Sequence, residues 1–125
     1  MATPTASYPG RAAIEAYGKG GFRFAGMSHR GSILCLANSI VAWEVMAPDE
    51  LTPEALAPVL AEKDVTRSLL LGTGARQVLA SPALRTAFRE AGIALEMMDT
   101  GAACRTFNVL LGERRPVAAA LIAVD

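Results

Sequence analysis

The sequence has few of the residues that build metal centres and disulfides. Its 125 residues include two cysteines, Cys35 and Cys104, and one histidine, His29. The cysteines lie far apart and form no CxxC pair, whereas a structural zinc site usually takes four cysteine or histidine ligands. We therefore expect no metal, and we interpret Cys35 as a small buried hydrophobic residue.

Excess charge and long apolar runs are missing as well. The 12 basic and 12 acidic residues cancel, so no overall field attracts the chain to nucleic acid or to an anionic membrane. The late apolar run, residues 117–124, has eight residues, although a membrane-spanning helix needs about 20. The N-terminus lacks the apolar core of a secretory signal. The sequence thus predicts no nucleic-acid partner, no membrane-spanning segment and a cytoplasmic location.

The first half of the chain carries strand signals. Residues 21–26 alternate phenylalanine with arginine, and residues 31–40 form a continuous apolar run that is typical of a buried strand. Trp43 falls on the apolar side of a third alternating segment. Glycines near residue 20 and the sequence SHRGS at 28–32 favour turns, so we expect these strands to form antiparallel hairpins.

The second half alternates helix and strand signals. Each expected helix begins at a capping residue, and the later two end at a glycine. The expected elements are a helix from Thr52, a strand at 68–74, a helix at 81–92, a strand at 93–98, a helix from Asp99 or Thr100 to about 111, and a strand at 116–124. This order predicts an α/β fold in which the strands at 68–74 and 93–98 are parallel neighbours.

The domain organisation follows from the length and from the N-terminal composition. A chain of 125 residues is long enough for one sizeable core. We therefore expect a single domain over residues 1–125, in which residues 1–13 form a flexible N-terminal arm.

Two glycine-containing loops follow the two strands that we expect to be parallel. They consist of Gly72, Thr73 and Gly74, and of Asp99, Thr100 and Gly101. Parallel strands would place both loops at the same carboxyl edge, where ligands favour binding. Glycine lets a ligand or a partner's backbone approach closely, and the helix after the second loop offers free N–H groups. Gln77 stands where a dinucleotide fingerprint needs its third glycine, so we expect no cofactor.

The last helix has two faces. Ala103, Phe107, Leu110 and Leu111 form an apolar face, and Gly101, Arg105, Asn108 and Gly112 follow helical spacing on another. The guanidinium of Arg105 and the amide of Asn108 suit a carboxylate or a peptide backbone, so we expect them to face a groove beside Gly72–Gly74. The same residues also fit a structural role, with Arg105 in an ion pair, Asn108 bonded to a loop and Asp99 as a cap.

In several of these motifs the chain resembles a known family. The motifs are GFRFAG, HRGSILCL, the Trp43 strand, LLLGTG and MDTGAACRTFNVLLGERRPVAAAL, which occur in the family's order over about residues 14–124. The family includes the mitochondrial NADH dehydrogenase (complex I) assembly factor 3 proteins and an adipogenesis-associated relative of animals. Phe107 stands where a tyrosine is usual in the family. The chain looks like a bacterial member, and a eukaryotic one would lie in the mitochondrial matrix.

The resemblance implies a single three-layer α/β domain with a mixed central sheet. For the mitochondrial members it implies a role in complex I assembly through a partner assembly factor, and it implies no established catalytic activity, cofactor or metal. We therefore expect a non-catalytic binding or assembly-factor module, linked to respiratory-complex or membrane-protein assembly. Its partner would be a protein, and a homo-oligomer fits the same expectation.

An alternative from another class stays open at this point. A small-molecule binding protein or enzyme could use the same two glycine loops, with Arg105 binding an anionic group and Asp99 or Cys104 performing the chemistry. Cys104 lies in the first turn of the expected helix beside Arg105, and both features lower a thiol pKa. A cavity on which Arg105 and Asp99 converge would favour the enzyme, and a shallow apolar patch would favour a partner surface.

Overall fold

A computed structural model describes residues 7–125, which form two sheets and three α-helices. The larger sheet has six strands in the order β1-β6-β5-β9-β7-β8. These are β1 (Ser7–Tyr8), β5 (Ser32–Cys35), β6 (Ile40–Trp43), β7 (Ser68–Gly72), β8 (Ala94–Met98) and β9 (Val117–Leu121). The smaller sheet consists of β2 (Ile14–Gly18), β3 (Gly21–Phe24) and β4 (Met27–Arg30).

The six-stranded sheet is mixed, as expected. Strand β7 lies between β8 and β9 and runs parallel to both, with Leu69 opposite Leu95 and Ala118. Strands β9, β5 and β6 pair in antiparallel fashion, and β1 adds to the outer side of β6. The predicted parallel pairing of segments 68–74 and 93–98 is therefore confirmed.

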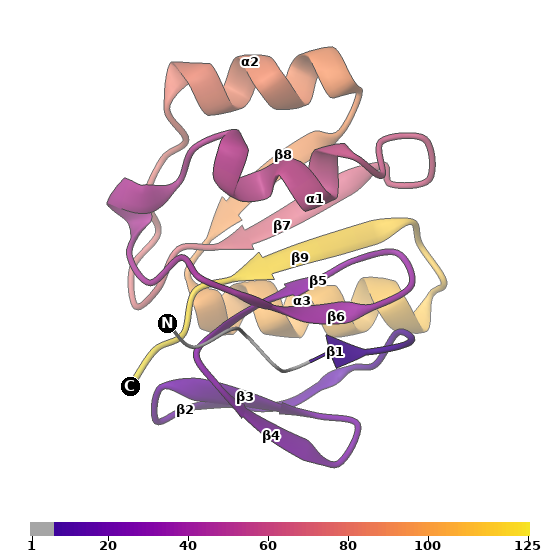
Figure 1. Cartoon of the computed structure of the whole chain (residues 1–125), viewed down its shortest axis with the longest axis vertical. Coiled ribbons are helices and arrows are strands. Elements are labelled where there is room, and N and C mark those ends of the chain that lie inside the picture. The colour runs from indigo at the N-terminus through magenta and orange to yellow at the C-terminus, as the bar shows by residue number, and fades with distance from the viewer. Residues whose placement is uncertain (1–6) are drawn as a thin grey trace.

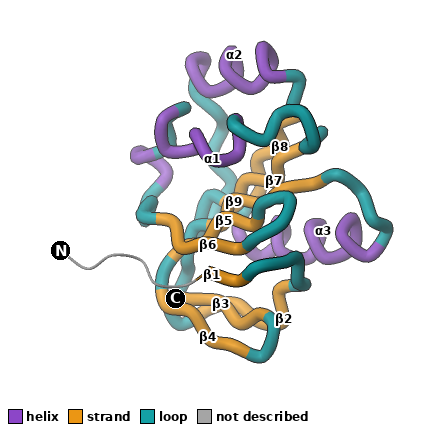
Figure 2. Tube along the Cα trace, turned by 45° about the vertical axis from the view of Figure 1, so that its right-hand side comes forward, coloured by secondary structure: helices purple, strands orange, loops and turns teal. Residues whose placement is uncertain are grey.

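Helices cover both faces of this sheet (Figures 1 and 2). Helices α1 (Ala57–Leu60) and α2 (Pro82–Ala91) lie on one face, and α3 (Thr100–Gly112) lies on the other beside the three-stranded sheet. The central strands send alternate side chains into two cores, because strand side chains alternate between faces. Leu69 and Leu71 join Phe88 in the first core, and Leu70 joins Phe107 in the second. The predicted three-layer α/β architecture is confirmed.

The predicted ends of α2 are confirmed in atomic detail. Ser81 Oγ accepts a hydrogen bond from the Leu84 N–H at 3.1 Å, and Pro82 occupies the first helical turn. Gly92 ends the helix with a φ of 75°, a left-handed conformation that costs glycine little. Leu84 and Phe88 are buried, so the predicted apolar face of α2 packs onto the sheet.

The helix predicted from Thr52 is divided into a 3-10 turn and a short α-helix. Thr52 Oγ1 does accept a hydrogen bond from the Ala55 N–H at 3.1 Å. The segment then forms the 3-10 turn η2 (Glu54–Leu56) and only four residues of α1, after an earlier 3-10 turn, η1 (Pro48–Glu50). Pro58 explains the break, because proline cannot donate to the carbonyl four residues earlier and its ring collides with that turn.

The bend predicted within residues 28–32 is confined to Gly31, whose φ is 100°. Residues 27–30 form β4, and β3 connects to it through Ala25 and Gly26, whose φ angles are 50° and 73°. Lys19 and Gly20, with φ angles of 54° and 80°, connect β2 to β3 in the same way. Positive φ at both loop residues is typical of the type I′ turn, whose twist matches that of a hairpin.

The N-terminal arm predicted for residues 1–13 is described only in part. Residues 1–6 lie outside the described residues. Ser7 and Tyr8 pair with Val41 and Ile40 of β6, and Arg11 Nη2 donates to the Val117 carbonyl at 3.0 Å. Among the described residues, no helix has both the length and the apolar character to cross a bilayer.

Candidate functional site

The two predicted loops lie together at the carboxyl edge of β7 and β8, where they bond to each other. Thr100 N–H donates to Gly74 O at 2.8 Å, and Gly74 N–H donates to Thr100 Oγ1 at 2.9 Å. The Thr100 hydroxyl donates in turn to Ile122 O at 2.7 Å. A Cβ atom on Gly72 would lie 2.9 Å from Thr100 Cα. Glycine at position 72 therefore allows the two loops to touch.

The other polar residues of these loops also serve local structure. Thr73 is buried, and its hydroxyl lies 2.5 Å from Arg76 O and accepts a hydrogen bond from the Val78 N–H at 3.1 Å. Asp99 is the N-cap of α3, where it accepts a hydrogen bond from the Ala102 N–H at 2.8 Å. The sequence allowed either Asp99 or Thr100 as the capping residue, and the structure shows that Asp99 is the cap.

Asn108 faces β2 and not the Gly72–Gly74 loop. Its Oδ1 atom accepts from the Ile14 N–H at 2.8 Å, and its Nδ2 atom donates to Ile14 O at 2.9 Å. The side-chain amide therefore pairs with both backbone groups of Ile14, as a neighbouring strand would. The expectation that Asn108 lines a groove beside Gly72–Gly74 is not met, because β2 occupies this side of α3.

Arg105 faces the same strand. Its Nη1 atom donates to Tyr17 Oη at 3.1 Å. A Cβ atom on Gly101 would lie 2.5 Å from that hydroxyl oxygen, so the absence of a side chain at 101 lets Tyr17 sit against the first turn of α3. Arg105 and Gly101 thus come together with Tyr17, a residue that the sequence did not single out, and not with Gly72–Gly74.

We expect the Asn108 contact to contribute measurably to stability. Asn108→Ala removes both partners of Ile14, and leaving buried backbone groups unpaired should lower the free energy of unfolding by about 2 kcal/mol. Val109→Ala is the matched control, because Val109 is 59% exposed on the next position of α3 and should change stability by less than about 0.5 kcal/mol. Urea denaturation followed by circular dichroism measures both, and equal midpoints for the two variants would contradict this role.

Neither thiol is set up as a nucleophile. Burial raises the pKa of Cys104 to about 12, against the opposing effect of the nearby Arg105 guanidinium. Burial also raises the pKa of Cys35 far above its usual value. A thiol attacks as its thiolate, and at neutral pH Cys104 is protonated inside the core that it shares with Cys35 and Phe107.

A groove of about 600 Å³ opens elsewhere, on the three-stranded sheet. The register places Ala16 and Ser28 opposite Arg23, and opposed residues of antiparallel strands share a face. This face points away from Phe22 and Phe24, which are buried in the second core. Tyr17 and His29 are opposed to Phe22 and share its inward face. The groove is lined by residues from both faces: Ala16, Tyr17, Gly18, Lys19, Gly21, Phe22, Arg23, Ser28, His29 and Arg30.

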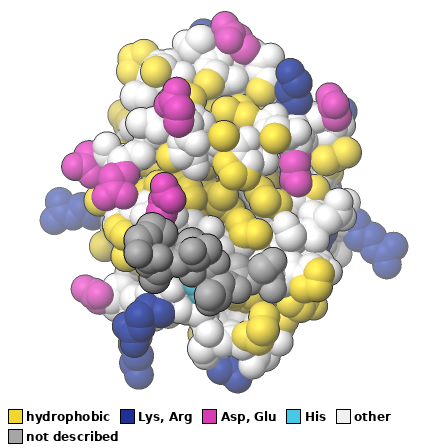
Figure 3. Space-filling view, in the orientation of Figure 1, with side chains coloured by type: hydrophobic (Ala, Val, Ile, Leu, Met, Phe, Trp, Pro, Cys, Tyr) yellow, Lys and Arg dark blue, Asp and Glu magenta, His cyan; other side chains and the backbone are white. Residues whose placement is uncertain are grey.

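The groove is basic, although the chain as a whole is neutral. Lys19, Arg23 and Arg30 line it, and no aspartate or glutamate is among its lining residues. In the space-filling view, basic side chains project from the lower end of the molecule, where the ribbon view places β2–β4 (Figures 1 and 3). Sequence reasoning missed these residues; an excess of cations over acids within residues 16–30 was the available signal.

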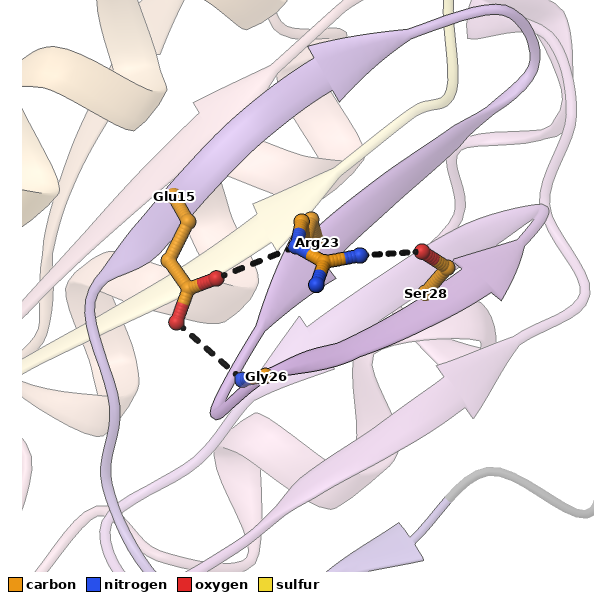
Figure 4. A network of polar contacts seen from close by, with 4 residues as sticks. All are labelled: Glu15, Arg23, Gly26 and Ser28. Carbon is orange, nitrogen blue, oxygen red and sulfur yellow. Dashed lines mark hydrogen bonds and ion pairs between the residues drawn. The ribbon is translucent and has the colours of Figure 1, made fainter.

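A polar network holds Arg23 across the three strands (Figure 4). Its Nε atom lies 3.5 Å from Glu15 Oε1, and its Nη1 atom donates to Ser28 Oγ at 3.0 Å. Glu15 also accepts from the Gly26 N–H at 3.1 Å, which ties β2 to the turn between β3 and β4. Arg23 is thus fixed in place, and Glu15 offsets part of its charge.

Known proteins resemble the chain along most of its length. The family described as "Protein of unknown function (DUF498/DUF598)" matches residues 14–122. The mouse protein named NADH dehydrogenase (ubiquinone) 1 alpha subcomplex assembly factor 3 is 32% identical over 115 residues, which cover 92% of this chain and 62% of the mouse protein. The chain therefore spans less than two thirds of the length of this relative.

Two bacterial proteins match over nearly their whole length. An uncharacterised protein of Rhodobacter capsulatus is 36% identical over 122 residues, which cover 98% of this chain and 93% of that protein. A crystal structure described as that of an outer membrane protein from Bartonella henselae superposes with a TM-score of 0.91 at 50% identity, covering 94% of this chain and 99% of the other. The family model matches residues 14–122, in agreement with the resemblance to complex I assembly factor 3 proteins seen in the sequence. The chain therefore belongs to the DUF498/DUF598 family.

Proposed function

We propose that this chain is a non-catalytic binding module that holds a protein partner during the assembly of a respiratory or other membrane complex. The observation that carries the proposal is the similarity to relatives named as complex I assembly factors, which extends over 92% of the chain in the mouse protein. Those relatives are longer, so the transfer of their role to this chain is itself part of the proposal. A cytoplasmic location, or the mitochondrial matrix in a eukaryote, remains a prediction.

The chemistry of the predicted loops supports binding over catalysis. Asp99 caps α3, the Thr100 hydroxyl joins the loop to Ile122, and Thr73 is bonded within its own loop. Arg105 donates to Tyr17, and burial keeps the Cys104 thiol protonated because its pKa is about 12. These interactions give each polar group a structural partner, which favours a stabilising role over the bond-breaking role of the alternative enzyme.

We place the partner surface on the exposed sides of α3 and β2. Tyr17 is 42% exposed and Val109 is 59% exposed, and Arg105 is exposed between them. Tyrosine and arginine are among the side chains that contribute most to binding at protein interfaces. The other predicted residues would support this surface from the interior of the domain: Gly72, Thr73, Gly74, Asp99, Thr100, Gly101 and Asn108.

Arg105→Ala tests the surface. The substitution removes an exposed guanidinium and leaves the apolar face of α3 intact, so the melting temperature should stay within a few degrees of wild type. The tagged protein, purified from its own cells and examined by mass spectrometry, should retain a subunit or assembly factor of a membrane complex, and the variant should lose it. Arg89→Ala removes the same charge from α2, in the opposite layer, and should retain the partner.

Three outcomes would contradict the proposal in different ways. If Arg105→Ala unfolds the protein while recovery per folded molecule is unchanged, Arg105 is structural and the proposed surface is wrong. A substrate that wild type turns over, and that Asp99→Asn or Cys104→Ser no longer converts at unchanged stability, would replace the binding module with an enzyme. Recovery of only a second copy of the chain would assign the surface to a homo-oligomer.

A further inference from the structure

We infer that the groove on β2–β4 binds an acidic segment of the partner protein, with Lys19 and Arg30 contacting its carboxylates. This inference rests on the proposed function and assigns the chemistry of the partner. It starts from charge: among the described residues, three cations and no acid line the groove, in a chain whose charges cancel. Glu15 pairs with Arg23, so Lys19 and Arg30 carry the local excess. A local excess of one sign favours a ligand of the other sign.

Lys19 and Arg30 both belong to the end of the groove where β2 turns into β3. Lys19 and Gly20 form the turn between β2 and β3, and Arg30 Nη1 lies 3.8 Å from the position that a Cβ atom on Gly20 would take. Within the part of the chain that the structure describes, neither cation forms an ion pair, whereas Arg23 is paired with Glu15. A carboxylate bound at this end of the groove would therefore meet two cations that have no acidic partner among the described residues.

The groove itself favours a peptide over a polyphosphate. Alongside the cations, the lining includes the apolar residues Ala16 and Phe22 and the aromatic residue Tyr17. A lining that combines apolar residues with cations suits a segment with both carboxylates and apolar side chains, and arginine matches the planar carboxylate with paired hydrogen bonds. A volume of about 600 Å³ lies in the range of pockets that hold compact ligands. The neutral chain offers no extended field for a nucleic acid or a membrane.

A random-sequence peptide library provides the probe, because the partner's sequence is not needed. The immobilised full chain should select peptides enriched in aspartate and glutamate together with apolar residues. Fluorescence anisotropy with a selected peptide should show at least about tenfold weaker binding to Lys19→Gln/Arg30→Gln, since both charge-assisted contacts are lost. Raised salt should weaken binding to wild type more than to this variant.

Arg85→Gln/Arg89→Gln is the matched control. It removes the same two charges from the exposed side of α2, so peptide binding should remain at the wild-type level. Glutamine at 19 adds no backbone strain beyond that of lysine, because both residues carry a Cβ atom at the positive φ. Melting curves of both double variants establish that each is folded before binding is compared.

Several outcomes would overturn the inference. The inference fails if the selected peptides are not enriched in acidic residues, or if no peptide is selected. It also fails if both double variants lose peptide binding to the same degree. A different outcome is that the chain binds phosphatidylserine-containing vesicles or duplex DNA more strongly than the peptides. If that binding depends on Lys19 and Arg30, the groove is assigned to another anion. If the cellular partner is recovered equally well by Lys19→Gln/Arg30→Gln, the groove inference fails and the binding module stands. If wild type recovers no partner, the binding module fails and the peptide selection still decides the groove.

Discussion

Trp43→Ala should lower the free energy of unfolding by about 3–5 kcal/mol, the usual cost of truncating a large core aromatic residue. Trp43 is 6% exposed and packs in the first core, as the alternation around it predicted. Its indole N–H donates to Ala55 O at 2.8 Å, which fastens β6 to the turn before α1. Truncation therefore creates a cavity and removes this link. A domain of ordinary stability would lose a large fraction of its free energy of unfolding.

Trp43→Phe separates the two contributions. Phenylalanine fills most of the space and loses the hydrogen bond with a small part of the packing, so the cost should fall to about 1–2 kcal/mol. Trp43 is the one tryptophan of the chain, so urea denaturation must be followed by circular dichroism and not by tryptophan fluorescence. A cost below about 1 kcal/mol for Trp43→Ala would be inconsistent with a core residue.

Gly72→Val should lower the free energy of unfolding by about 3 kcal/mol, at the upper end of the usual cost of overpacking. The first added carbon would lie 2.9 Å from Thr100 Cα and 3.2 Å from Leu121 Cδ2. Thr100 cannot move away, because its backbone and hydroxyl are bonded to Gly74 and Ile122. Thermal denaturation should show a lower melting temperature, and an unchanged one would mean that the two loops can separate freely.

Gly101→Ala is the matched control within the same pair of loops. Its Cβ atom would meet Tyr17 Oη at 2.5 Å, but this oxygen lies at the end of a side chain that is 42% exposed and can rotate away. Alanine also favours the helix over glycine by about 1 kcal/mol. We therefore expect stability within about 1 kcal/mol of wild type, together with loss of the hydrogen bond between Arg105 and Tyr17.

The fold could be predicted where local chemistry and tertiary packing agree. Ser81 and Gly92 bound α2 because a capping hydroxyl and a left-handed glycine act within one turn of the helix. The SHRGS segment bends only at Gly31, because its first residues belong to β4, and Ala25 with Gly26 forms the hairpin turn before that strand. Alanine is unusual at positive φ, so the composition of that turn gave no warning.

The candidate site was harder to predict for a different reason. The sequence correctly brought the loops at 72–74 and 99–101 to one edge, because parallel strands fix that geometry. It could not show that glycine at 72 makes room for Thr100 rather than for a ligand, or that Asn108 bonds to Ile14 from 94 positions away. Such contacts depend on how α3 packs against β2, which no local pattern encodes.

The hairpins of the small sheet have a consequence for how this fold can change. All the residues that line the groove fall between positions 16 and 30, a stretch closed by two tight turns. Its inward residues, such as Phe22, belong to the core, while Ala16, Arg23 and Ser28 lie on the outward face. Exchanging only the outward residues of this short segment with those of a relative should therefore transplant ligand preference between family members, as loop grafting does between antibodies, without redesign of the scaffold.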